Sequence, residues 1–267
     1  SKLIAFFGRL NYDFDQKYYF SASLRKEGST RFGKNHKWGY FPAASAAWRL
    51  TEEKFLKGVS WLNELKLRAD YGETGNQDFG NYRSLNIYGG AGYYVYNGVT
   101  YQVWGPSQNA NYDLRWEKAL NFNVGLDFDI LNNKVSGSIN YYIRTNKDLL
   151  GYYNVSNPPN IQSQTYANVG TMKNSGLELQ VNGSVVTKKN FTYNISFAGA
   201  TNNNKFVSFS NELFKGQTHQ DVVGMPAPGS PGKVHGVEES KGTGGFYRSK
   251  AGGLDEAGAA RQTAPRA

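Results

Sequence analysis

The sequence predicts an all-β protein: an antiparallel, up-and-down sheet that forms the wall of a transmembrane β-barrel with long external loops. Apolar and polar residues alternate with a period of two along most of the chain, as in strands with one apolar face. The predicted strands are about 9 to 14 residues long, enough to cross a bilayer at a tilt, whereas strands of soluble proteins are about 5 to 6 residues long. Short turns alternate with long loops, which is the asymmetry of outer-membrane barrels.

Eight strands are predicted in order along the chain. Their ranges are Ile4–Phe14, Tyr18–Leu24, Ala44–Leu50, Glu64–Gly72, Leu120–Ile130, Val135–Ile143, Leu177–Val185 and Phe191–Gly199. In the last five, the 25 positions of the apolar phase hold no charged residue, whereas the 23 interleaved positions, counted with Arg144 next to Ile143, hold eight. That division predicts one face towards hydrocarbon and one towards a water-filled lumen. Aromatic residues next to the turns, as in interfacial girdles, are Phe14, Tyr18, Phe128, Phe191 and Tyr193.

The connections between these strands are of two lengths. Tight turns rich in Asn, Asp and Lys are predicted at Asp15–Lys17, Leu131–Asn133 and Thr187–Asn190. Long loops are predicted at Gly28–Gly39, Gly75–Trp116 and Asp148–Val169. One connection on the short side, Thr51–Asn63, is expected to hold a helical turn with Thr51 as its N-cap.

Composition limits the class of protein. The chain has 267 residues, a net charge of +9, no Cys and 15% aromatic residues, so it is neither disordered nor stabilised by disulfides. Its longest apolar run, Leu3–Phe7, is too short for a membrane-spanning helix. We expect residues 1–209 to hold the barrel strands and their loops. Residues 210–267 are expected to form a Gly/Pro-rich external loop, truncated before the closing strands, so that the chain is an internal piece of a larger barrel.

The sequence does not predict an enzyme, a cofactor or a metal site. His36, His219 and His235 are isolated from potential partners, and no phosphate-binding loop motif occurs. Asp127 and Asp129 share one strand face, where solvated lumen residues are the favoured interpretation. Nucleic-acid binding is disfavoured because charges and aromatics alternate between strand faces and do not line one groove. Basic residues expected to meet anionic outer-membrane lipid and lipopolysaccharide are Arg25, Lys26, Arg31, Lys34 and Lys37.

The loop Gly75–Trp116 has the composition of a binding surface. It contains ten aromatic residues and only four charged ones. Aromatic faces pack on sugar C–H surfaces or on peptide side chains, and Tyr hydroxyls bind the polar edge. The residues predicted to contact a ligand or a lid subunit are Tyr93, Tyr94, Tyr96, Tyr101 and Trp104. The alternative is that these rings pack on neighbouring loops or on a lid partner and touch no substrate.

Motifs in a fixed order lie along most of the chain, among them Gly28–Gly33, Trp61–Arg68, Tyr71–Gln77 and Leu114–Glu117. They resemble motifs of the SusC/RagA-like TonB-dependent outer-membrane transporters of Bacteroidetes. Gly28–Gly33 (GSTRFG) is similar to the family's GSSRFG, and Trp61–Arg68 (WLNELKLR) to its WLxxLKLR. Tyr71–Gln77 (YGETGNQ) is similar to its YGxTGNQ, and Leu114–Glu117 (LRWE) and Asn168–Gly170 also resemble family landmarks. The residues of this sequence that match the family's motifs are Tyr71, Gly72, Thr74, Gly75, Asn76, Gln77, Trp116, Glu117, Asn168, Gly170, Gly176 and Glu178.

The resemblance implies part of a barrel of about 22 strands with a plugged lumen, in the bacterial outer membrane as a multi-pass protein. It implies uptake of oligosaccharides or peptides as nutrients, a SusD-like lid lipoprotein over the long loops, and TonB as a partner through an N-terminal plug region that is missing here. Two other readings stay open. One is a structural or adaptor barrel in a larger surface complex that transports nothing, and the other is a secreted carbohydrate-binding β-sandwich.

Overall fold

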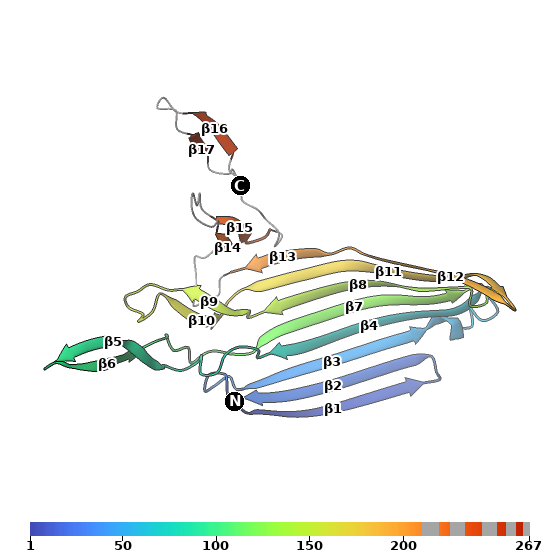
Figure 1. The fold of residues 1–267 in the computed structure, drawn as a ribbon. Helices are drawn as coiled ribbons and strands as arrows, with labels where there is room; N and C mark the ends of the chain where they lie inside the picture. Colours follow the sequence, from blue (N-terminus) through green and yellow to red (C-terminus); the bar gives the residue numbers. More distant parts are fainter. Residues whose placement is uncertain (210–218, 225–232, 242–249, 255–259, 264–267) are drawn as a thin grey trace.

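The computed structural model describes residues 1–209, 219–224, 233–241, 250–254 and 260–263 (Figure 1). Its main feature is a nine-stranded antiparallel sheet in the order β1-β2-β3-β4-β7-β8-β11-β12, with β13 also paired to β11. The strands are β1 (Leu3–Phe14), β2 (Tyr18–Ser29), β3 (Trp38–Arg49), β4 (Leu62–Asn76), β7 (Glu117–Ile130), β8 (Val135–Lys147), β11 (Thr171–Lys188), β12 (Phe191–Ala200) and β13 (Asn203–Ser208). The eight predicted strands are all present, and most are longer than predicted.

The register places the apolar phases of successive strands on one face of the sheet. One row of paired positions is Tyr12, Phe20, Ala46, Ala69, Val124, Tyr141 and Leu177. The next row is Asn11, Ser21, Ser45, Asp70, Asn123, Tyr142 and Gly176. The apolar face is open: Leu10 is 70% exposed and Phe197 is 59% exposed. Such an extended open apolar face requires an apolar environment, as the prediction of a hydrocarbon-facing wall supposes.

Side chains on the polar face bind one another across strands. Arg68 makes a bidentate ion pair with Asp127, with N–O distances of 2.8 and 2.9 Å, and also donates to Asn140 Oδ1 at 2.7 Å. Asn123 donates to Asp70 at 2.6 Å. Three neighbouring strands are therefore joined on this face by charge-assisted hydrogen bonds.

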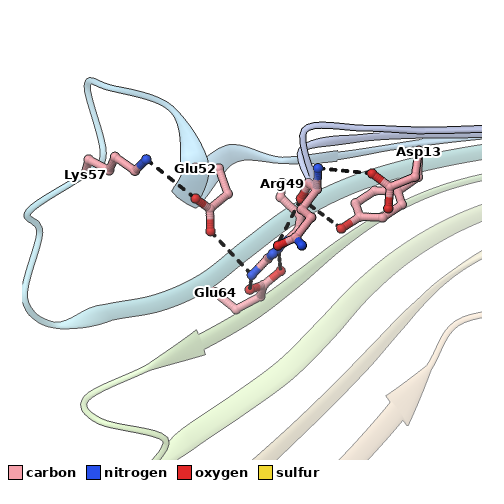
Figure 2. Close-up of polar contacts among 7 residues, drawn as sticks. Asp13, Arg49, Glu52, Lys57 and Glu64 are labelled. Carbon is pink, nitrogen blue, oxygen red and sulfur yellow. Dashed lines mark hydrogen bonds and ion pairs between the residues drawn. The ribbon is translucent and has the colours of Figure 1, made fainter.

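At the turn end of the sheet a chain of polar contacts joins β1, β2, β3 and β4 (Figure 2). Arg49 binds Glu64 through two hydrogen bonds of 2.9 and 2.7 Å, and Glu52 lies 3.6 Å from Arg49 and 3.8 Å from Lys57. The carbonyl of Gln16, in the β1–β2 turn, accepts from Tyr19 and Arg49. This turn has φ values of 53° at Asp15 and 51° at Gln16, the left-handed conformation of tight hairpins.

The predicted helical turn is shorter than expected, and its predicted cap is wrong. The element is a 3-10 turn, η1 (Leu50–Glu52), with Arg49 at the N-cap position and no capping side chain. Thr51 Oγ1 is buried without a hydrogen-bond partner among the described residues. Glu53 instead turns towards the sheet, where its carboxylate accepts from the Tyr18 hydroxyl at 2.9 Å and Trp48 Nε1 at 3.1 Å. Glu53 is also the C-cap residue of the turn, with an extended backbone (φ −77°, ψ 143°).

Two of the long loops contain hairpins. The first holds β5 (Tyr88–Tyr96) and β6 (Val99–Pro106), and the second holds β9 (Leu150–Asn154) and β10 (Gln164–Asn168). In Figure 1 both lie at the loop end of the sheet, and β5–β6 projects furthest beyond it.

The predicted external loop over 210–267 lies largely outside the described residues. The described parts are two hairpins, β14 (His219–Gly224) with β15 (Lys233–Glu238), and β16 (Lys250–Leu254) with β17 (Ala260–Thr263). Over the described part of the chain, no helix has the length and apolar character to cross a membrane.

Candidate functional site

The five aromatic residues predicted to contact a ligand or lid all lie on the β5–β6 hairpin. The hairpin closes at Asn97 and Gly98, with φ values of 50° and 76°, as a two-residue turn of the Asn-Gly kind requires. Tyr94 and Tyr101 are directly paired, and their rings stack with centroids 5.3 Å apart. From Ser84 to Tyr112 the chain carries no charged residue. The hairpin is therefore an uncharged, ring-bearing projection.

Both faces of this hairpin are open. The alternation of the strands puts Tyr94, Tyr96 and Tyr101 on one face and Tyr93 and Trp104 on the other. Exposed fractions are 72% for Tyr93, 53% for Tyr94, 62% for Tyr96, 43% for Tyr101 and 63% for Trp104. Within the described chain these rings do not pack deeply on neighbouring loops. They are free to cover apolar surfaces of another molecule, with hydroxyls and the indole N–H as donors.

Asn109 anchors the base of the β5–β6 hairpin to the loop that holds β9 and β10. Its side chain is buried at 8% exposure and makes four hydrogen bonds. Nδ2 donates to the carbonyls of Gln162 (2.8 Å) and Gln164 (2.9 Å), and Oδ1 accepts from the amides of Ile161 (3.1 Å) and Gln162 (3.0 Å). Asn109 thereby contributes four hydrogen bonds between the β5–β6 and β9–β10 loops, and Gln162 Nε2 adds one to the Pro106 carbonyl at 3.2 Å. Sequence analysis missed this residue, because nothing near Asn109 indicates a partner more than fifty residues away.

Asn168, a motif residue, makes a second connection between these loops. Its side chain accepts from the Arg115 amide at 2.8 Å and donates to the Arg115 carbonyl at 2.6 Å, in the manner of a paired strand residue. Arg115 also binds Asp148 at 2.6 Å. Nearby, the buried Tyr153 hydroxyl donates to the Val169 carbonyl, and burial raises the pKa of Tyr153 to about 12. This phenol therefore stays protonated at neutral pH and acts as a hydrogen-bond donor.

A small hydrophobic core beneath the loops brings three motifs together. Its buried members are Phe32, Phe41, Phe79, Leu114 and Trp116, and Leu150 and Tyr166 pack against it. Trp116 also donates from Nε1 to the Lys37 carbonyl at 3.1 Å. Gly75 lies against the Phe41 ring so closely that a Cβ atom would overlap it. The motif glycine is therefore required for close packing.

The structure gives most other motif residues local bonding roles. Tyr71 donates to Glu73 at 2.8 Å, the Asn76 side chain accepts from the Asp78 amide at 2.8 Å, and the Gln77 carbonyl accepts from Arg31 at 2.9 Å. Glu117 accepts from the Leu150 amide at 3.2 Å. Gly170 has a φ of 104°, and Gly176 packs against the Thr201 carbonyl. Gly72 and Thr74 are ladder positions of β4, and Glu178 lies on the polar face of β11, away from this cluster.

The arrangement at this end of the sheet is suited to binding. The hairpin offers rings, hydroxyls and strand edges, and it carries no Asp, Glu, His, Lys, Arg or Cys. Among the described residues, no group of three or more His, Cys, Asp or Glu side chains could hold a metal ion.

Comparison with known proteins gives consistent similarities. The family profile described as "TonB dependent receptor-like, beta-barrel" matches residues 1–250. TonB-dependent receptor SusC of Bacteroides thetaiotaomicron is 36% identical over 211 residues, which cover 78% of this chain and 21% of SusC. TonB-dependent receptor P39 of Formosa agariphila is also 36% identical over 211 residues, covering 79% of this chain and 20% of P39. The chain thus spans about one fifth of the length of these relatives.

Solved structures are similar over nearly the whole chain. The RagAB peptide importer in its "closed-closed" state superposes with a TM-score of 0.79 at 26% identity, covering 99% of this chain and 29% of that one. The "open-open" state of the same importer gives a TM-score of 0.79 at 28% identity, covering 95% and 26%.

Proposed function

Because the chain belongs to the TonB-dependent receptor-like β-barrel family, we propose that it is the barrel-wall portion of an outer-membrane importer for oligosaccharides or peptides. The observation that carries this proposal is the register. Across the eight consecutively paired strands it keeps the apolar phases together on one face, where charged residues occur only towards the strand ends, and the polar phases on the other. A wall between hydrocarbon and a wet lumen needs that division on every strand.

In this proposal the wall acts passively and catalyses no reaction. The polar face, with Arg68, Asp127 and Asn123, lines the lumen and offers hydrogen bonds to a polar solute. A plug elsewhere in the parent protein gates that lumen, and TonB acts on the plug. The outer edges of β1 and β12 then pair with further strands of the same barrel, because unpaired backbone groups are costly in lipid. The protein is a multi-pass component of the bacterial outer membrane.

The long loops form the external mouth, and the β5–β6 hairpin contacts the imported ligand or a SusD-like lid lipoprotein. Support comes from the exposed rings of Tyr93, Tyr94, Tyr96, Tyr101 and Trp104 and from the absence of charge between Ser84 and Tyr112. The relatives include a protein described as a peptide importer, which makes a peptide one candidate ligand class. Sugars remain the other, because their apolar faces also stack on aromatic rings.

The test is uptake by a strain that lacks the full-length gene. Labelled oligosaccharides and labelled peptides are supplied separately, and the strain is complemented with the wild-type gene or with one lacking the TonB-contacting segment. We expect one ligand class to be lost on deletion and restored only by the wild-type gene. Intact uptake of both classes, together with loss of a surface protein complex, would instead show the adaptor barrel.

A further inference from the structure

Four lysines lie together on the apolar face of the sheet, at its loop end. They are Lys118 on β7, Lys147 on β8, Lys173 on β11 and Lys205 on β13. The ladder sets their orientation: Lys118, Lys147 and Lys173 have the same strand phase as the apolar positions Phe122, Ile143 and Leu177 of their strands, and Lys205 is paired with Lys173. Four adjacent strands thus each carry a lysine on the apolar face towards the loop end.

The register brings these like charges directly opposite one another. Lys118 is paired with Lys147 between β7 and β8, and Lys173 is paired with Lys205 between β11 and β13. Like charges at directly opposed positions destabilise a sheet. An arrangement that repeats this cost on two strand pairs calls for a compensating anion.

The chain itself supplies little of that anion. Glu73 lies 3.3 Å from Lys118 and also accepts from Tyr71. The other three lysines are exposed and make no ion pair with any described residue. The nearby acids at the rim are engaged elsewhere, since Asp148 binds Arg115 and Glu117 accepts from the Leu150 amide.

The position along the strands matches a lipid headgroup layer. Lys118 and Lys147 lie twelve residues from the strand ends Ile130 and Val135, respectively, at the tight turn. At about 3.3 Å per residue and a strand tilt of about 40°, this is roughly 30 Å along the membrane normal. The apolar band of such barrels is about 25 Å tall. The lysines therefore lie just beyond hydrocarbon on the loop side.

We propose that Lys118, Lys147, Lys173 and Lys205 bind the phosphates of lipopolysaccharide in the outer leaflet. The inference rests on the proposed function, which places the loop end outside the cell. Phosphate is a dense anion that one site can share among several ammonium groups, and paired lysines neutralise more than one phosphate charge. The acyl chains of the same lipid then cover the apolar rows below.

This site differs from the basic residues singled out in the sequence. Arg25 is on the polar face, where its guanidinium group forms an ion pair with the Glu27 carboxylate. Arg31 donates a hydrogen bond to the Gln77 carbonyl. Lys26 is on the apolar face, with its ammonium group 5.0 Å from the Trp38 ring centroid and 5.2 Å from that of Tyr40. The four-lysine cluster is thus a separate surface, formed by strands far from the first loop.

The experiment measures lipopolysaccharide bound to the full-length protein, purified in detergent. The test variant is K118Q/K147Q/K173Q/K205Q, and the matched control is K54Q/K57Q/K134Q/K189Q, which removes the same charge from exposed lysines at the opposite, turn end. Purified lipopolysaccharide is titrated, and binding is followed by native mass spectrometry. We expect about tenfold or more weaker binding for the test variant and unchanged binding for the control.

Two further probes separate the sources of binding. Dephosphorylated lipopolysaccharide should bind the wild type as weakly as it binds the test variant, and phosphatidylglycerol should not distinguish the variants. Equal affinity of wild type and test variant overturns the lysine site and leaves the importer proposal standing. Loss of binding in the control variant instead shows that the turn end faces outwards, which overturns the orientation in the proposed function as well.

Discussion

Gly75 and Gly72 lie three residues apart in the same motif on β4, yet they face different surroundings. A Cβ atom at Gly75 would overlap the Phe41 ring, whereas at Gly72 it would lie 3.4 Å from the Ala43 Cβ, an ordinary contact. We expect Gly75→Ala to cost about 1–3 kcal/mol by overpacking. Gly72→Ala is the matched control and should stay near wild type. The free energy of unfolding in detergent, measured with denaturant, checks both, and equal effects would contradict the packing role of Gly75.

Glu53 provides a pH-dependent contact outside the membrane-spanning segments. Hydrogen bonds from Tyr18 and then Trp48, with Lys17 nearby, lower the pKa of Glu53 below its ordinary 4.5. A lowered folded-state pKa stabilises the fold above about pH 4.5, and this contribution is lost as pH falls through the folded value. We therefore expect Glu53→Gln to lower the thermal unfolding midpoint at pH 7, with the difference from wild type closing below about pH 4.5.

The control for this prediction is the Tyr18→Phe background, which lacks the contact with the largest effect on the Glu53 pKa. The effect of Glu53→Gln should be smaller there at pH 7. A difference from wild type that does not change with pH would mean that Glu53 acts only through packing.

At the residue scale, the sequence indicates types of residue better than their partners. Gly75 and Asn168 stand in recognisable motifs, but the packing of Gly75 depends on Phe41 and the pairing of Asn168 on Arg115, and both partners are distant in sequence. Thr51 is a residue type that favours the N-cap position, but that position is held by Arg49, and the neighbouring Glu53 binds Tyr18 and Trp48. Contacts of this kind depend on side chains of neighbouring strands, which local sequence does not reveal.

At the scale of elements, the β5–β6 hairpin is expected to bind without supporting the fold. Replacing Tyr93, Tyr94, Tyr96 and Trp104 together by Ala removes exposed rings and leaves the sheet intact. We expect normal assembly of the full-length protein and weaker binding of the ligand or lid, measured by co-purification and titration. Phe55→Ala/Trp61→Ala, at exposed positions of the turn end, is the control. Unchanged affinity for both partners would remove the hairpin from the binding surface.

The orientation of that hairpin depends on Asn109. Asn109→Ala leaves the amides of Ile161 and Gln162 and two carbonyls without their side-chain partner, so we expect faster hydrogen exchange at Ile161 and Gln162. Asn109→Asp keeps the acceptor and should give an intermediate rate. Asn160→Ala, which removes a hydrogen bond within one loop, serves as the control. Unchanged exchange in Asn109→Ala would show that the loops are held together by other contacts.

Strand elements were predictable from the sequence where alternation is strict, and less so at their ends. β2 runs on to Ser29 and β8 to Lys147, through charged residues that carry no apolar signal. The β5–β6 hairpin was predicted as loop, although Asn97-Gly98 between alternating aromatic residues is a strong hairpin signal. The strands on either side of this turn carry aromatic residues on both faces, so they lack the division into an apolar and a polar phase that marks the other strands.

At the scale of the whole molecule, the division between two faces is the property to test. Val124 and Asn123 are adjacent on β7 and point to opposite faces. Val124→Arg should cost about 2–4 kcal/mol because it puts a charge on the lipid side near mid-membrane. Asn123→Arg, beside Asp70 on the polar side, should be tolerated. Folding titrations into lipid vesicles measure both, and a cost at Asn123 equal to that at Val124 would contradict the assignment of faces.

The order β1 to β12 in the main sheet follows from the sequence because, once the two loop hairpins are set aside, each of these strands pairs with its sequential neighbour. Only the pairing of β13 with β11 departs from that rule in the main sheet. The arrangement of the β5–β6 and β9–β10 loops relative to each other does not follow from the sequence. It depends on Asn109, Asn168 and the Phe41–Trp116 core, whose contacts join segments distant in sequence. Local periodicity therefore predicts the wall, and only the three-dimensional structure reveals the mouth.

The uncharged hairpin has a practical consequence for mapping the cell surface by proteolysis. Trypsin cuts after Lys and Arg, and no such residue lies between Arg83 and Arg115. Intact cells treated with trypsin would keep this projection whole, however exposed it is. Chymotrypsin, which cuts after Tyr and Trp, would trim it first at Tyr93, Tyr96 and Trp104, and the peptides it releases would report which loops of a living cell are uncovered.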